Sequence, residues 1–272
     1  MFKNIVCFPH KLGQKKCGVE KTPKLFVEFL KKKHTNMNIY HVSCKNSEYF
    51  FNSNLKNLYH TNKQIPNNQF RLNIGGDHSM AIASLGYTLN EEPNCKVVWV
   101  DAHPDINTYE ESDSKNFHGM PLAYLTGLQR DNRFGFLHNK LPFEHLLYIG
   151  LRSIDDFEQK VIHKHNIYTI GCEDVNKNLE NTLSKIDNFL GNSPFHLSFD
   201  VDSLDPSVIS CTGTPVENGI QEECGIKLIN HLVKKNTLKN MDLTEINTEL
   251  ANSKDIIEKT FNYIEKTIHP LF

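Results

Sequence analysis

The sequence has few of the features that mark secreted, membrane-bound or nucleic-acid-binding proteins. Its seven cysteines are an odd number and include no C-x-x-C pair, which argues against a disulfide framework or a structural zinc site. No stretch approaches the roughly 18 apolar residues of a membrane span, and the N-terminal apolar run is too short for a signal peptide. A formal net charge of -2 gives no basic footprint for nucleic acid. We therefore expect a cytoplasmic protein with reduced thiols, which binds neither membrane nor nucleic acid.

Short apolar runs alternate with helix-like segments along the 272 residues. The expected strands are 4–8, 38–42, 70–74, 96–100, 146–150, 166–170, 195–199 and 238–243. The expected helices are 22–33, 79–89, 119–128, 155–164, 176–190, 221–235 and 252–267. This alternation predicts an α/β fold with a mostly parallel sheet of about eight strands, covered by helices on both faces.

Two further features bear on domain organisation. No stretch has the composition of a linker, so we expect one domain spanning residues 1–272. The segment 43–69 is rich in asparagine, lysine and serine and has little hydrophobic pattern. It is either a mobile surface segment or a helix and loop with a weak sequence signal, and the sequence leaves both interpretations open.

Polar motifs follow four of the expected strands. They are "GGDHS" (75–79), "DAHPDIN" (101–107), "DVDSLDP" (200–206) and "TEIN" (244–247). Ligands of open parallel sheets bind at the carboxyl ends of the strands, where all four motifs fall. In an extended chain, side chains two residues apart point to the same side. Asp101, His103 and Asp105 can therefore converge on one point, and the pair Asp200 and Asp202 repeats the pattern.

These motifs offer six ligand-type residues for a metal centre: His78, Asp101, His103, Asp105, Asp200 and Asp202. Taken singly, a histidine after two glycines or an aspartate after a strand is more often structural, for example as a helix cap. Together, four carboxylates repel one another unless a cation lies between them. The mixture of carboxylate and imidazole suits a hard or borderline ion such as Mn²⁺ better than tetrahedral zinc. Six ligands exceed the needs of one ion, so two ions that share a bridging water fit the count.

The motifs in combination resemble those of the ureohydrolases, the arginase and agmatinase family. The resemblance rests on "GGDHS", "DAHPDIN", "HGMPLA" and "SFDVDSLDP…TGTPV", and extends from "GQKKCGVEKTP" (13–23) to "DLTEIN" (242–247). It implies a three-layer α/β/α fold with an eight-stranded parallel sheet, two Mn²⁺ ions per chain, and a homo-oligomer, a trimer or hexamer. It assigns the ligands as follows: Asp101 and Asp200 bridge the ions, His78 and Asp105 complete one ion's shell, and His103 and Asp202 complete the other's.

Within the family, the arginases are the best match. The segment "NTYEESDSKNFH" (107–118) resembles the one with which they hold the substrate's α-carboxylate, and the matching residues are Asn107, Ser114 and Asn116. Asp155 falls where an arginase aspartate meets the α-amino group. Without the resemblance, these residues would be taken for ordinary loop and turn chemistry. With it, the implied substrate is L-arginine, hydrolysed to L-ornithine and urea.

Three residues depart from the arginase pattern. Ser153 stands in place of a common aspartate, and Lys115 and Asn218 stand in place of glycines. The change at Ser153 weakens the expected recognition of the α-amino group. We therefore expect a high KM for an arginase.

The implied mechanism is attack on the guanidinium by a metal-bridged hydroxide, which Asp105 orients. His118 serves as a proton shuttle for the leaving amine, a role that its near-neutral pKa suits. Glu245 pairs with the guanidinium and Thr214 adds a hydrogen bond. Two alternatives remain open: another ureohydrolase, such as an agmatinase or guanidino-acid hydrolase, and a metal-containing relative without catalytic activity.

Overall fold

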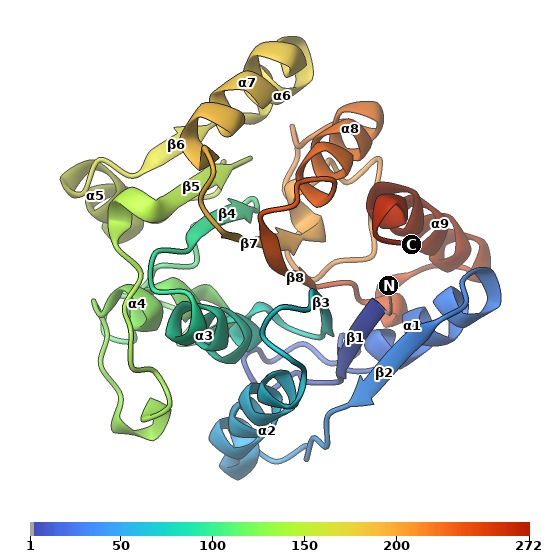
Figure 1. Ribbon diagram of the computed structural model, residues 1–272, viewed down its shortest axis with the longest axis horizontal. Helices are drawn as coiled ribbons and strands as arrows, with labels where there is room; N and C mark the ends of the chain where they lie inside the picture. The colour runs from blue at the N-terminus through green and yellow to red at the C-terminus, as the bar shows by residue number, and fades with distance from the viewer. Residues whose placement is uncertain (1–2) are drawn as a thin grey trace.

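One parallel sheet of eight strands forms the middle layer of the molecule in the computed structural model, which describes residues 3–272 (Figure 1). The strands are β1 (Lys3–Phe8), β2 (Met37–His41), β3 (Arg71–Gly75), β4 (Lys96–Val100), β5 (Leu146–Ile149), β6 (Tyr168–Ile170), β7 (Phe195–Asp200) and β8 (Leu238–Thr244). Their order in the sheet is β2-β1-β3-β8-β7-β4-β5-β6, and every neighbouring pair is parallel. The eight predicted strands are confirmed, with their ends displaced by at most two residues.

The α-helices of the described residues number nine. They are α1 (Thr22–Lys33), α2 (Phe51–Gln64), α3 (Ala81–Glu91), α4 (Pro121–Thr126), α5 (Asp156–Lys164), α6 (Cys172–Lys177), α7 (Leu179–Leu190), α8 (Glu222–Val233) and α9 (Lys254–Ile268). Six match predicted helices closely. The other three, α2, α6 and α7, differ from the prediction.

Helix α2 lies in the segment whose sequence left two interpretations open. Phe51, Leu55, Leu58 and Tyr59 are buried at helical spacing, and together they form one apolar stripe. The rest of the helix is largely asparagine and lysine, which weakens the periodic signal. The interpretation as a helix with a weak signal is therefore confirmed.

The single helix predicted at 176–190 is wrong in its extent. Helix α6 starts earlier, at Cys172, and the chain leaves helical geometry at Asn178, where φ is -134° and ψ is 46°. The Asn178 N–H still donates to the Asp174 carbonyl at 2.9 Å, so α6 closes normally and α7 starts with a change of direction. Asparagine is a poor helix former, which fits a break at this position.

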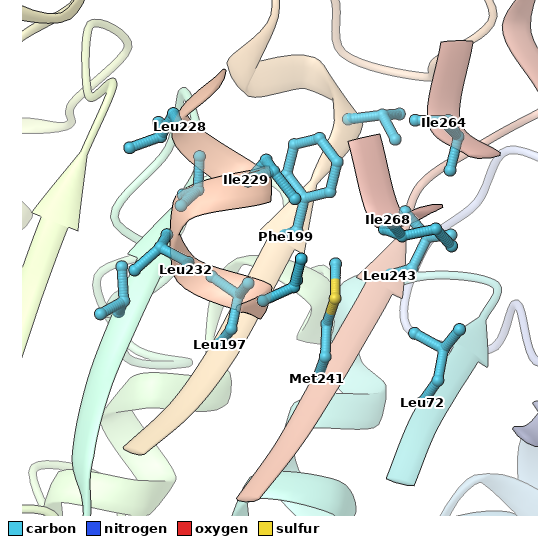
Figure 2. Packing of buried hydrophobic residues seen from close by; sticks show 14 of the residues in the cluster. Leu72, Leu197, Phe199, Leu228, Ile229, Leu232, Met241, Leu243, Ile264 and Ile268 are labelled. Carbon is cyan, nitrogen blue, oxygen red and sulfur yellow. The ribbon is translucent and has the colours of Figure 1, made fainter. Parts of the chain in front are cut away.

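The sheet has an apolar layer on each face, in agreement with the predicted three-layer α/β/α fold. Along β1, Ile5 and Cys7 pack in the layer under α1 and α6 to α9, whereas Val6 and Phe8 pack in the layer under α2, α3 and α4. Helix α5 covers the same face farther along the sheet. Figure 2 shows the first layer at its centre, where α8 and α9 cover β7, β8 and β3. The labelled side chains there are Leu228, Ile229, Leu232, Ile264 and Ile268 from the helices, and Leu72, Leu197, Phe199, Met241 and Leu243 from the strands.

The topology brings the four polar motifs together. Strands β3, β8, β7 and β4 are consecutive neighbours in the middle of the sheet, and each is followed by one motif. Because all strands are parallel, the motifs emerge at the same edge. All seven cysteines are free thiols, as predicted. Within residues 3–272, no helix combines the length and the apolar character needed to cross a bilayer.

Candidate active site

His78 lies at the centre of a buried cluster of carboxylates. Its Nδ1 atom is 3.1 Å from Asp101 Oδ2, 3.0 Å from Asp105 Oδ2 and 3.2 Å from Asp200 Oδ2. All four residues are buried. Carboxylate oxygens from two segments, the loop after β4 and the end of β7, thus lie around one imidazole nitrogen.

A second cluster forms around His103. Its Nδ1 atom is 3.2 Å from Asp202 Oδ2 and 3.5 Å from Asp101 Oδ1. Asp101 therefore takes part in both clusters, with one carboxylate oxygen in each. Asp200 lies in the His78 cluster, and its other oxygen accepts the Asp202 N–H at 2.9 Å. The structure thus brings together all six ligand-type residues singled out in the sequence.

Neighbouring side chains fix the orientation of the His78 cluster. His78 Nε2 is 2.8 Å from Ser198 Oγ, and the imidazole stacks on the indole of Trp99 with ring centroids 4.2 Å apart. The Trp99 Nε1–H donates to Asp101 Oδ2 at 3.0 Å. If Nε2 carries the proton, Nδ1 presents a lone pair to three carboxylate oxygens, and it has no hydrogen-bond partner there. That arrangement is repulsive unless a cation occupies the space, so the donor set fits a metal ion.

The electrostatics of the chain alone lead to the same conclusion. Burial and the charge of Asp101 raise the pKa of Asp105 to about 7. Burial also raises the pKa of Asp200 well above its usual range, and the charges of the neighbouring aspartates add to this. Burial disfavours the charged form of His103, but Asp101 and Asp202 outweigh it and raise its pKa to about 12. Without a metal, protons must neutralise the cluster, and divalent ions can take over that role.

His118 and Glu245 form a pair next to the metal-ligand cluster. His118 Nδ1 is 3.1 Å from Glu245 Oε1, which also accepts the His78 N–H at 2.8 Å. Gln14 Nε2 donates to the other oxygen, Oε2, at 2.7 Å. Burial alone would lower the pKa of His118, but its hydrogen bond to Glu245 raises that pKa to about 9. Glu245 thus favours the protonated form of His118.

A pocket opens above the cluster. Its lining comprises His103, Asp105, Asn107, Ser112, Ser114, His118, Gly119, Ser153, Asp155, Glu158, Asp200, Asp202 and Thr214. Of the residues predicted to bind substrate, Asn107, Ser114, Asp155 and Thr214 line it, and Asn116 does not. Asn107 Nδ2 donates to Asp155 Oδ2 at 2.8 Å, and Thr214 Oγ1 donates to Asp202 Oδ2 at 2.9 Å. Apart from Gly119, every residue of the lining has a polar or ionisable side chain.

Three residues around this pocket were not predicted from the sequence. Ser112 and Glu158 line it, and Gln14 supports Glu245 from the segment 13–23. Glu158 accepts two backbone N–H groups, that of Asp155 at 3.1 Å and that of Ile106 at 3.2 Å. The bond from Asp155 is half of a capping box at the start of α5. The D-x-x-E spacing at the predicted helix start could have identified Glu158. No local signal identifies Gln14, whose partner is 231 residues away.

Comparison with known proteins gives a consistent result. The model of the Arginase family matches residues 5–268. An arginase of Entamoeba histolytica is 33% identical over an alignment of 289 positions that covers 98% of this chain and 96% of that protein. An arginase of Coccidioides posadasii is 41% identical over 196 residues, which is 66% of this chain and 59% of that protein.

A solved structure is similar over the whole fold. The crystal structure of Entamoeba histolytica arginase in complex with L-ornithine has a TM-score of 0.89 and 31% sequence identity. The alignment covers 99% of this chain and 98% of that one. The similarity therefore includes the sheet, both helical layers and the loops that carry the polar motifs.

Proposed function

The chain belongs to the arginase family of metal-dependent hydrolases, and we propose that it converts L-arginine and water to L-ornithine and urea. The observation that carries the proposal is the convergence of six metal-ligating side chains below a polar pocket that also holds His118. Relatives named arginase, and the L-ornithine complex of one of them, support this substrate. A single domain over residues 1–272 would carry out the reaction.

The metal set is proposed as two Mn²⁺ ions. His78, Asp101, Asp105 and Asp200 would hold one ion, and Asp101, His103, Asp200 and Asp202 the other. Bound metal would supply a water whose pKa is lowered from 15.7 to about 7. The identity of the metal rests on the mixture of carboxylate and imidazole donors and on the family resemblance.

The remaining roles fall to side chains of the chain itself. Asp105 would orient the attacking water towards the guanidinium carbon. His118, held as a proton donor by Glu245, would protonate the leaving amine of ornithine. Glu245 is only 1% exposed, and its Oε1 atom contacts His118. We therefore assign Glu245 the role of supporting His118, in addition to the pairing with the guanidinium that the sequence predicted.

The other end of the pocket would bind the amino-acid part of the substrate. The Ser114 hydroxyl is a donor for a carboxylate, and Asn107 is held in place by Asp155. Asp155 would accept a hydrogen bond from the α-ammonium group. Asn116, which lies outside the pocket lining, would act through its N–H, which donates to Ser114 Oγ at 3.2 Å.

Metal analysis combined with urea release tests the proposal. Mn²⁺-loaded protein should contain close to two ions per chain and release urea from L-arginine. Asp200→Ala should lose more manganese and activity than Asp202→Ala, because the proposed role of Asp200 is to bridge both ions. Full activity with one ion or fewer per chain would contradict the two-metal proposal.

Location and assembly belong to the same proposal. Seven free thiols support a reducing, cytoplasmic compartment. A homo-oligomer, a trimer or hexamer, rests on the family resemblance. Light scattering coupled to size-exclusion chromatography measures the assembly directly.

A further inference from the structure

Apart from the clusters around His78 and His103, three further side chains that could hold a metal ion lie where α1 and α9 end. His34 follows α1 directly, Glu265 is in the last turn of α9, and His269 comes just after α9. His34 Nε2 is 2.9 Å and His269 Nδ1 is 3.0 Å from the same atom, Oε1 of Glu265. The three ligand atoms all lie within 4.8 Å of one another.

The donor set and its spacing fit a borderline divalent ion. Two imidazole nitrogens and a carboxylate oxygen are donors that zinc and nickel prefer. Ligand atoms about 2.1 Å from a common ion stand about 3.0 Å apart at right angles and about 3.4 Å apart at the tetrahedral angle. The two observed separations, 2.9 and 3.0 Å, lie close to the value for ligands at right angles. We propose that His34, Glu265 and His269 bind a divalent ion of the zinc and nickel class, with water completing its shell.

The ligands are held in place before an ion arrives. The His34 ring stacks on Phe272 with centroids 4.2 Å apart, and its side chain is 11% exposed. Glu265 and His269 are four residues apart, so they lie on one face of the chain. Lys33 Nζ approaches the other carboxylate oxygen, Oε2, at 3.4 Å, and leaves Oε1 to the imidazoles. His269 is 67% exposed, which gives an ion a path from solvent.

This site is separate from the carboxylate-rich centre. Helices α1 and α9 lie side by side (Figure 1). Each runs from the carboxyl ends of the strands back towards the end of the sheet where the strands begin. The six residues of β1 span about 16 Å, so a comparable distance separates the amino and carboxyl ends of the strands. Phe26 and Phe29 of α1 already pack on Phe261 of α9, and an ion would clamp the ends of the same two helices. The inference does not depend on the proposed arginase activity.

Calorimetric titration of Ni²⁺ into Mn²⁺-saturated protein tests this site. The proteins compared are wild type, His34→Asn, His269→Asn and the control His163→Asn, which changes an exposed histidine of α5. We expect wild type and control to bind one Ni²⁺ per chain at this site with a rise in Tm. In either ligand variant, the affinity should fall by at least about 100-fold and the rise in Tm should disappear.

Because His269 is largely exposed, its replacement leaves the fold in place and any loss can be assigned to the site. Zn²⁺ in place of Ni²⁺ should give the same order among the four proteins. Equal heats and equal shifts in Tm across all four would overturn the proposal, because the added ion would then bind elsewhere.

Discussion

Two residues of the site, Asp105 and Glu245, have a strained backbone conformation. Asp105 has a φ of 50° and Glu245 a φ of 65°, a left-handed conformation that costs a residue other than glycine about 1–3 kcal/mol. Both residues have proposed roles in the site. Lys115 and Asn218 share this conformation, with φ of 57° and 62°. Glycine adopts this conformation without cost, so Lys115 and Asn218 each carry a backbone strain that glycine would avoid.

His118 provides a prediction about proton transfer. His118→Ala should lower kcat by about 10²–10⁴-fold, because a general acid is lost, while the manganese content stays unchanged. Added imidazole should restore part of the rate. The matched control is His138→Ala, at an exposed histidine. Loss of manganese from His118→Ala would show that the residue holds the metal and is no proton donor.

Glu158 provides a prediction about pH. Burial raises the pKa of Glu158 to about 8, whereas an unfolded glutamate has a pKa of about 4.3. Between these values the native state retains a proton that the unfolded state has released, so this group makes stability fall as pH rises. Glu158→Gln should therefore flatten the decline of Tm between about pH 5 and pH 8 in chelator-treated protein.

The control for this prediction is Glu223→Gln, at an exposed glutamate at the start of α8. It should leave the pH profile of Tm unchanged. If the profile of Glu158→Gln runs parallel to that of wild type, Glu158 ionises normally and the account of its burial is wrong.

At the scale of the elements, the sequence predicted the sheet better than the helices. Buried parallel strands are continuous apolar runs, such as "KVVWV" in β4, and the polar motifs mark their ends. The carboxyl-edge rule then placed His78, Asp101 and Asp200 together. Helix α2 was only one of two interpretations of its segment, because its apolar stripe is interrupted by asparagine and lysine. Contacts such as Gln14 with Glu245 depend on strand order, which a sequence pattern does not contain.

Helix α2 therefore provides a prediction about stability. Leu58 is fully buried between this helix and the sheet, so Leu58→Ala should destabilise the protein by about 2–5 kcal/mol through lost burial and a cavity. Lys56→Ala, on the exposed face of the same helix, should change stability by less than about 0.5 kcal/mol. Urea denaturation measures both. A Leu58→Ala variant as stable as the control would mean that α2 is not packed in solution.

At the scale of the whole molecule, strand order explains why the site exists. Four neighbouring strands in the middle of one parallel sheet each deliver part of a single charged cluster to the same edge. The pocket above it is lined by residues from the segments that follow β4, β5 and β7. The proposed metal ligands and the proposed substrate contacts thus share the loop after β4, where Asp105 and Asn107 are two residues apart and both line the pocket.

The choice of substrate tests the central claim most directly. L-arginine and agmatine share the guanidinium, but agmatine lacks the carboxylate that Asn107 and Ser114 are proposed to receive, with Asn116 acting through its N–H on Ser114. Polar groups left without a partner penalise the wrong substrate. Steady-state urea release by the Mn²⁺-loaded protein should give a higher kcat/KM for L-arginine than for agmatine, with a high KM because of Ser153. Equal or reversed kcat/KM values would contradict the assignment as an arginase and favour another ureohydrolase.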